Sequence, residues 1–224
     1  MKKISIYIVL ILVFLALSKS FSPSEQNSIK IPNERVFSDL FLGAPLSIIL
    51  VDSFTAGFLI KTFYQKYRII YGFRTPETVV VRTSQIFWEK NLPNLGMSLF
   101  RRDDQDGSES VVPTPPGALY IGDNAFGYWE RADSGEKIWR FHRAYRNFPK
   151  IFRWGDFVAT REFYDKLMIH LKDQIPFYGL HSEFGTDGSI TKQNWTEHVK
   201  SAEIKKRKFR EHIKKYPYLP PYKK

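Results

Sequence analysis

The chain has 224 residues, of which 43% are hydrophobic and 16% aromatic. This is enough for one domain with a real core and too little for a second full domain. The chain contains no cysteine, which excludes disulfides, cysteine nucleophiles, thiolate metal sites and a lipid anchor carried by cysteine. An exported chain of this kind fits a bacterial envelope better than a eukaryotic secretory route.

The formal net charge of +11 belongs to the two ends of the chain. Residues 200–224 hold ten Lys and Arg against two acidic residues, and the first 20 residues supply the rest of the excess. Residues 21–199 carry 21 basic and 21 acidic residues and are neutral. The pattern therefore predicts a neutral folded part that ends in a basic tail.

The N-terminus has the pattern of an export signal. Lys2 and Lys3 precede a 14-residue apolar run over Ile4–Leu17, and small residues follow at the spacing that a signal peptidase reads. Residues 1–20 are thus predicted to be a signal peptide or an uncleaved signal anchor. Residues 21–37 are polar and show no period, so we interpret them as a linker before a single domain over 38–199.

A second apolar stretch, Leu40–Ile60, is long enough to span a bilayer. Asp52 lies near its centre, and an acid there costs about 2.5–3.5 kcal/mol on insertion scales. From Ala56 onward, apolar residues that include Phe63 and Tyr67 recur with a helical period. We predict a helix that is buried or apposed to a membrane, and a two-span membrane protein that uses 40–60 is the alternative.

The next residues predict short strands and a loop. Residues 68–73 and 78–83 are rich in β-branched and aromatic side chains, which is typical of strands. Residues 84–90 predict a short helix or strand. Residues 101–116 are rich in Asp, Ser, Gly and Pro and predict an exposed loop.

The chain is organised around Gly117–Tyr178, in which Tyr120–Tyr178 holds 15 of the 36 aromatic residues. Because aromatic side chains bury large areas, this segment is predicted to supply most of the core. Residues 128–131 and 137–143 predict a hairpin, and Thr160 is placed to cap a following helix. The predicted fold class is α+β, with a small antiparallel sheet and flanking helices in one aromatic-rich domain, an N-terminal signal helix and a basic C-terminal helix or tail.

Motifs for catalysis, phosphate binding or zinc ligation are missing from the sequence, so neither a metal nor a cofactor is predicted. The weak candidates for a catalytic role are His142, Asp156 and Asp123. They would serve a hydrolase or transferase that acts on a cell-wall or glycan substrate. Both aspartates follow a glycine, which is more simply typical of a turn.

Arginines alternate with aromatic residues in the central segment. Arg side chains grip carboxylate or phosphate and rings stack on sugar, although Arg stems also cover aromatic cores. The candidate ligand-binding residues are Arg140, Arg143, Arg146, Arg153, Trp139 and Trp154. The tail offers polyanion-binding candidates, which are Lys205, Lys206, Arg207, Lys208, Arg210, Lys214 and Lys215.

These observations favour a non-catalytic exported protein of the periplasm or cell envelope. Its expected partner is an anionic membrane surface or a cell-wall polymer, and nucleic acid is disfavoured because the folded part is neutral. An enzyme of the envelope is the alternative. Nothing in the sequence predicts an oligomeric state.

Overall fold

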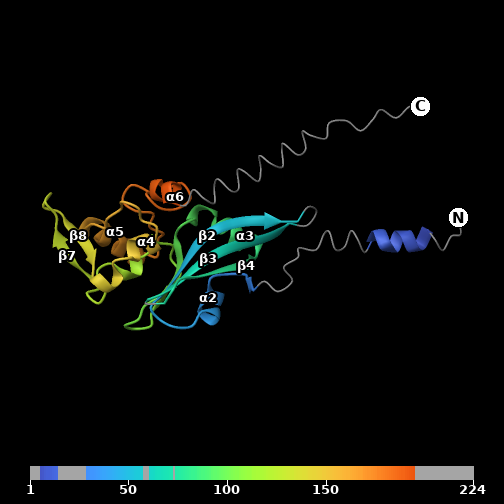
Figure 1. The fold of residues 1–224 in the computed structure, drawn as a ribbon, viewed down its shortest axis with the longest axis horizontal. Coiled ribbons are helices and arrows are strands. Elements are labelled where there is room, and N and C mark those ends of the chain that lie inside the picture. Colours follow the sequence, from blue (N-terminus) through green and yellow to red (C-terminus); the bar gives the residue numbers. More distant parts are fainter. Residues whose placement is uncertain (1–5, 15–28, 58–60, 73, 195–224) are drawn as a thin grey trace, which may run out of the picture.

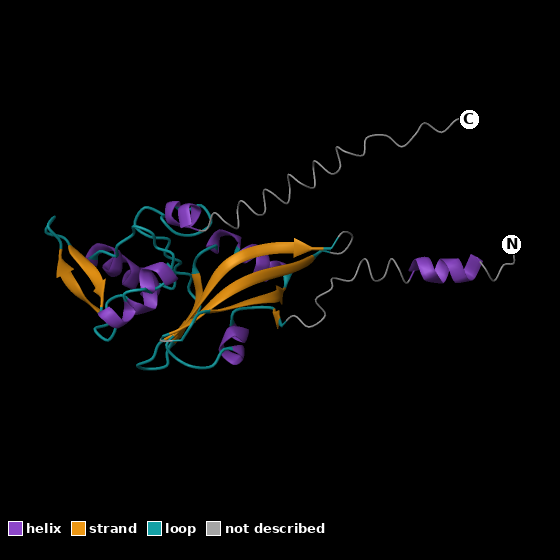
Figure 2. Cartoon of the chain, in the orientation of Figure 1, coloured by secondary structure: helices purple, strands orange, loops and turns teal. Residues whose placement is uncertain are grey.

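The structure is a computed structural model that describes residues 6–14, 29–57, 61–72 and 74–194. These residues form an α+β fold, as predicted, with a six-stranded sheet and a two-stranded sheet (Figure 1). The long strands of the larger sheet curl into half of a barrel (Figure 2). The helix over residues 6–14 precedes these elements, and its apolar side chains are exposed. Within the described residues, no helix has both the length and the apolar character needed to cross a membrane.

Short elements alternate along residues 29–194. The strands are β1 (Lys30–Ile31), β2 (Leu46–Ala56), β3 (Thr62–Tyr71), β4 (Glu77–Thr83), β5 (Ser98–Arg102), β6 (Glu109–Ser110), β7 (Gly127–Arg131) and β8 (Lys137–Phe141). The α-helices are α2 (Arg35–Leu40), α3 (Gln85–Lys90), α4 (Phe148–Ile151), α5 (Arg161–Lys172) and α6 (Ser189–Asn194). The 3-10 turns are η1 (Leu92–Asn94), η2 (Ala118–Tyr120) and η3 (Arg143–Tyr145). Helices this short are stabilised by packing rather than by helix propensity.

The larger sheet has the strand order β1-β4-β3-β2-β5-β6. Its strands pair antiparallel except at one edge, where β1 lies parallel to β4. The predicted small antiparallel sheet is therefore corrected to a mixed sheet of six strands. The second sheet is the hairpin of β7 and β8.

The predicted helix in the apolar stretch Leu40–Ile60 is wrong, because most of that stretch is strand β2. The first six residues of β2 are all buried, since the sheet is covered on both faces there. A strand buried on both faces reads as a continuous apolar run without alternation, and its period does not distinguish it from a buried helix. The predicted helical stripe through Phe63 and Tyr67 belongs to β3, in which buried and half-buried residues do not alternate strictly. The stretch 40–60, which the two-span alternative uses as a span, is likewise largely the strand β2.

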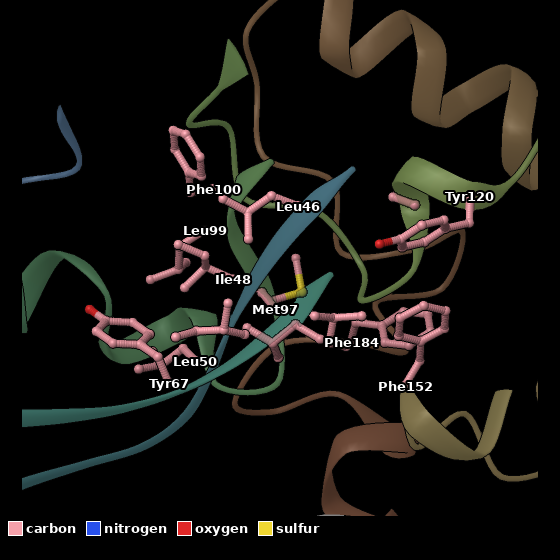
Figure 3. Packing of buried hydrophobic residues seen from close by; sticks show 14 of the residues in the cluster. Leu46, Ile48, Leu50, Tyr67, Met97, Leu99, Phe100, Tyr120, Phe152 and Phe184 are labelled. Atoms are coloured by element: carbon pink, nitrogen blue, oxygen red, sulfur yellow. The ribbon is translucent and has the colours of Figure 1, made fainter. Parts of the chain in front are cut away.

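One face of the sheet is covered by α2 and α3. Phe37 of α2 packs its ring 5.0 Å from that of Tyr67 and 6.0 Å from that of Phe100. The strand register places Ser47, Ile70 and Arg101 together on the opposite face. This second face meets the C-terminal half of the chain, from which Tyr120 and Phe152 pack toward the sheet (Figure 3).

The C-terminal half contributes a cluster of buried rings. Tyr120 lies 4.8 Å from Phe148 and 4.9 Å from Phe126, and Phe148 lies 5.2 Å from Phe152, measured between ring centroids. These rings confirm that the segment Gly117–Tyr178 is an aromatic core. However, 16 of the 30 residues in the buried cluster lie in residues 31–100, so the prediction that this segment supplies most of the core is wrong.

Local signals predicted several elements correctly. The hairpin forms between β7 and β8, and the strands at 68–73 and 78–83 lie within or overlap β3 and β4. Thr160 caps α5, because its hydroxyl accepts a hydrogen bond of 3.2 Å from the backbone N–H of Phe163. Residues 85–90 are the helix α3, which settles the choice left open for that segment.

Two segments predicted to be irregular contain packed structure. The described end of the predicted linker, 29–37, includes β1 and the start of α2, and its Ile31 and Phe37 are fully buried. In the predicted loop 101–116, β5 extends through its first two residues, and Thr114 exchanges backbone hydrogen bonds with Ser98. Only the turn over 104–109 of that loop is continuously exposed.

Candidate functional site

The aromatic side chains of the predicted ligand-binding face lie in the core. Trp139 and Trp154 are each 3% exposed. The Trp154 indole N–H donates a 2.8 Å hydrogen bond to the carbonyl of Pro116, and the Trp139 ring packs 5.1 Å from that of Trp129. These rings therefore cover other rings, and their faces are not available to a ligand in this structure.

The four candidate arginines fall into two groups. Arg140 and Arg143 are exposed on β8 and on the turn that follows it. Arg140 Nε donates a 2.8 Å hydrogen bond to Glu130 Oε2 on β7, and both side chains of this ion pair are about half exposed. Arg146 and Arg153 lie further along the chain, at either end of α4, and line one surface depression.

That depression has a volume of about 660 Å³. Besides Arg146 and Arg153 it is lined by Lys150, which α4 presents between them. Lys150 also lines a neighbouring depression of about 440 Å³, where it is joined by Arg68 of β3. We call these four cationic side chains the basic cluster. Among the described residues, no Asp or Glu lines either depression.

Arg68 reaches the basic cluster from the sheet. Its Nη1 donates a 3.1 Å hydrogen bond to the carbonyl of Ile151 at the end of α4. Burial, and after it the guanidinium of Arg153, lower the pKa of Arg68 from its usual value. Neighbouring cations create a positive potential, which attracts anions.

Arg153 is held in an unusual backbone conformation. Its φ is 56°, in the left-handed region that residues with a side chain avoid. Its backbone N–H bonds to the Lys150 carbonyl at 3.2 Å, and its Nη1 donates a 3.4 Å hydrogen bond to the carbonyl of Asn194 at the end of α6. Arg153 directly follows the C-cap of α4, a position where helices commonly end with a left-handed residue, and its guanidinium lies beside α6.

No hydrogen bond among the described residues links the three predicted catalytic residues. His142 is exposed and its Nε2 lies 3.0 Å from the carbonyl oxygen of Asn124. Asp123 accepts a 2.8 Å hydrogen bond from the backbone N–H of Ala125, as expected for a turn. Asp156 is exposed in a separate turn. Asp123 lines a cavity together with Asp103, and no histidine is among the residues that line it.

The histidines and acids of the described residues offer no group of three that could hold a metal ion. His170, one of the scattered histidines, lies with its Nδ1 3.2 Å from the carbonyl oxygen of Pro176, where it packs 4.9 Å from the ring of Phe177. This is the hydrogen-bonded structural role expected of a histidine at the edge of a helix stripe.

Sequence reasoning missed two members of the basic cluster. Lys150 had a usable signal, because Arg146, Lys150 and Arg153 follow one another at spacings of four and three residues. Residues at that spacing share one face of a helical turn. Arg68 had no such signal, because it comes from a strand about 80 residues earlier. The predicted polyanion-binding residues of the tail, from Lys205 to Lys215, lie outside the described residues.

Comparisons of this chain with known protein families, with curated proteins and with solved structures found no match.

Proposed function

We propose that the chain is an exported, non-catalytic protein of the bacterial cell envelope that binds an anionic membrane surface or cell-wall polymer. The binding surface is the basic cluster of Arg68, Arg146, Lys150 and Arg153, continued by the basic tail over 200–224. Periplasmic or envelope location, with the N-terminus as a signal peptide or anchor, belongs to the same proposal.

The observation that carries the proposal is the charge of the two adjoining depressions. Four cationic side chains line them, and no described acidic side chain does. In a folded region whose acids and bases balance overall, such a local excess of cations attracts anions. Arg offers paired N–H donors and Lys a point charge, which suits phosphate and carboxylate groups.

The position of the cluster also supports the proposal. Arg153 contacts the carbonyl of Asn194, the last residue of α6, and the next residues of the sequence lead to the tail. The tail alone carries a formal charge of +8. Clusters of Lys and Arg contribute about 1 kcal/mol per residue to binding at an anionic membrane. Two basic surfaces that adjoin in the chain can therefore bind one polyanion together.

The test is sedimentation of the full chain with vesicles that contain phosphatidylglycerol. We expect binding that weakens steeply as salt is raised, since binding depends on charge. Replacing Arg146 and Lys150 by Gln should lower binding about tenfold or more, from the loss of two cations. Deleting residues 200–224 should lower it further and flatten its salt dependence. Phosphatidylcholine vesicles measure any contribution of the apolar N-terminus.

A matched control replaces Arg131 and Lys137 by Gln, because both are exposed cations on the β7–β8 hairpin, away from the two depressions. This variant should bind as the unaltered chain does. Equal losses in the control and in the cluster variant would show that only total charge matters and would remove the cluster from the proposal. Binding that ignores salt and is equal on both lipids would contradict the whole proposal.

A further inference from the structure

Arg101 of β5 is a buried arginine that no carboxylate of the described residues pairs with. It is 4% exposed, and its Nη2 donates a 2.8 Å hydrogen bond to the hydroxyl of Ser110 on the adjacent strand β6. Its Nη1 is buried and has no hydrogen-bond acceptor among the described residues. Burial alone lowers the pKa of Arg101, to about 10, so the side chain is still charged at neutral pH.

A charged group in this position destabilises the fold. Burying an ion removes its hydration, and this penalty is offset only when an opposite charge and further hydrogen bonds are supplied. The protein supplies one neutral hydroxyl to Arg101. Strongly desolvated charged groups beside a cavity are characteristic of binding sites, where a ligand provides the missing partner.

Arg101 lines such a cavity, which has a volume of about 450 Å³. The cavity lies between the β5–β6 hairpin, the turn after η2 and helix α5. Its apolar wall includes Leu119, Met168 and Leu171. Polar and apolar side chains share the lining about equally, so the cavity suits a small ligand that has both a charged and an apolar part.

Two acids line the same cavity as Arg101. Asp103 Oδ1 accepts a 2.8 Å hydrogen bond from the backbone N–H of Gln105, and Asp123 Oδ2 accepts one of 3.1 Å from the Gln105 side chain. Gln105 therefore links the two carboxylates across the cavity. With one cation and two anions, the lining disfavours a simple anion and complements a ligand that carries both charges.

The geometry points to a binding site for a small zwitterion, an apolar amino acid or dipeptide. Its carboxylate pairs with Arg101, its ammonium group pairs with Asp103 and Asp123, and its side chain lies on Met168 and Leu171. This site is separate from the basic cluster and goes beyond the proposed function. No bond is made or broken in it.

Calorimetric titration of the full chain with L-leucine and with L-leucyl-L-leucine tests the site. We expect at least one of them to bind saturably with one site per chain. The amide of the same ligand lacks the carboxylate, and its N-acetyl form lacks the ammonium group. Each should bind about tenfold more weakly or worse, because a charge of the site is left without its partner in the ligand. No binding of either parent ligand at millimolar concentration overturns the proposal.

Variants locate the binding on Arg101. Replacing Arg101 by Met keeps an unbranched apolar side chain in place of the arginine stem and removes the charge, and it should abolish binding while raising the melting temperature. Arg82, which is exposed on β4, provides the matched control, and Arg82→Met should leave binding unchanged. Binding by Arg101→Met equal to that of the unaltered chain would overturn the assignment.

A second pair of variants tests the cavity without touching a buried charge. Met168 is 46% exposed and lines the cavity, whereas its neighbour Ile169 is 53% exposed and does not. Met168→Trp fills the cavity and should weaken binding about tenfold or more, because the ligand loses its place on the apolar wall. Ile169→Trp should have no effect. Equal behaviour of these two variants would also overturn the site.

Discussion

The two halves of the core are built from different side chains because their backbones differ. In the sheet half, long strands hold the chain in a regular ladder, and aliphatic residues such as Leu46, Ile48 and Leu50 fill the even spaces beside it. In the C-terminal half, helices of four to twelve residues and one hairpin leave irregular spaces. There, rings in edge-to-face contact fill the volume.

This difference indicates which substitutions each half of the core tolerates. A ladder of backbone hydrogen bonds keeps strands in place when one side chain shrinks, whereas the C-terminal half depends on the rings themselves. The space around one glycine from each half shows the same contrast in packing. At Gly117, a Cβ would lie 2.6 Å from a ring carbon of Phe152. At Gly43, which leads into β2, the nearest atom would be a ring carbon of Tyr71 at 3.8 Å.

The largest effect is expected from removing a ring in each half. Phe152 and Phe37 are both fully buried, and changing either to Ala should lower the free energy of unfolding by about 3–5 kcal/mol. Because both halves share one buried cluster, each variant should unfold in a single transition. Circular dichroism checks this by comparing the near-ultraviolet signal of the rings with the far-ultraviolet signal of the backbone. Loss of the ring signal first in Phe152→Ala would mean that the halves unfold separately.

A smaller loss of stability is expected from two glycine substitutions, which separate the cost of a steric clash from the cost of backbone strain. Gly117 and Gly135 both have a φ of 85°, but a Cβ at Gly135 would have nothing within 4 Å. Gly135→Ala should therefore cost only the strain of the left-handed conformation, about 1–2 kcal/mol. Gly117→Ala adds the clash with Phe152 and should cost at least about 1 kcal/mol more. Urea denaturation measures both, and equal losses would show that the rings of the C-terminal half move aside easily.

The smallest effect compares one helix cap from each half. The hydroxyls of Ser84 and Thr160 each accept a hydrogen bond of 3.2 Å from the backbone, from Phe87 and Phe163 respectively. Changing either to Ala should cost about 1 kcal/mol. Ser84→Ala should cost slightly more, because this hydroxyl also donates to the Pro32 carbonyl at 3.0 Å. Thr160→Ser keeps the cap and should stay within a few tenths of a kcal/mol of the unaltered chain. A Thr160→Ala chain as stable as Thr160→Ser would refute the role of the cap.

Short-range patterns predicted the parts of the fold that depend on neighbouring residues. The hairpin and the Thr160 cap are of this kind, because a turn or a first helical turn involves only a few consecutive residues. The strand β2 was missed because a run buried on both faces has no alternation to read. Its covering by two layers is a property of the whole fold.

In the candidate sites, too, residues that a local pattern marks were predicted, and residues brought in by the fold were missed. Arg146 and Arg153 were predicted because arginines alternate with aromatic residues in that segment, whereas Arg68 joins them only through the packing of β3 against α4. Arg101 lies in a stretch predicted to be an exposed loop, yet it is buried because β5 and β6 extend into that stretch. Composition describes a segment on average and does not reveal one inward-facing residue within it.

Arg102, the neighbour of Arg101 on the other face of β5, joins three parts of the chain. It pairs with Glu109 of β6, and its guanidinium donates hydrogen bonds of 2.8 Å to the carbonyl of Phe41 and 3.1 Å to those of Gly43 and Ser38. The carbonyls at the end of α2 are thus satisfied by a residue about 60 positions later in the sequence.

The dependence of α2 on Arg102 affects the order in which the chain folds. A ribosome makes α2 before it makes Arg102, so the newly made helix lacks the side chain that binds its last carbonyls. It also lacks Phe87 and Phe100, two of the rings against which its own Phe37 packs. A six-residue helix is unstable alone. We therefore expect α2 to be stably folded only after β5 has been synthesised and paired. The beginning of the domain is therefore among the last parts of the sheet half to be fixed in place.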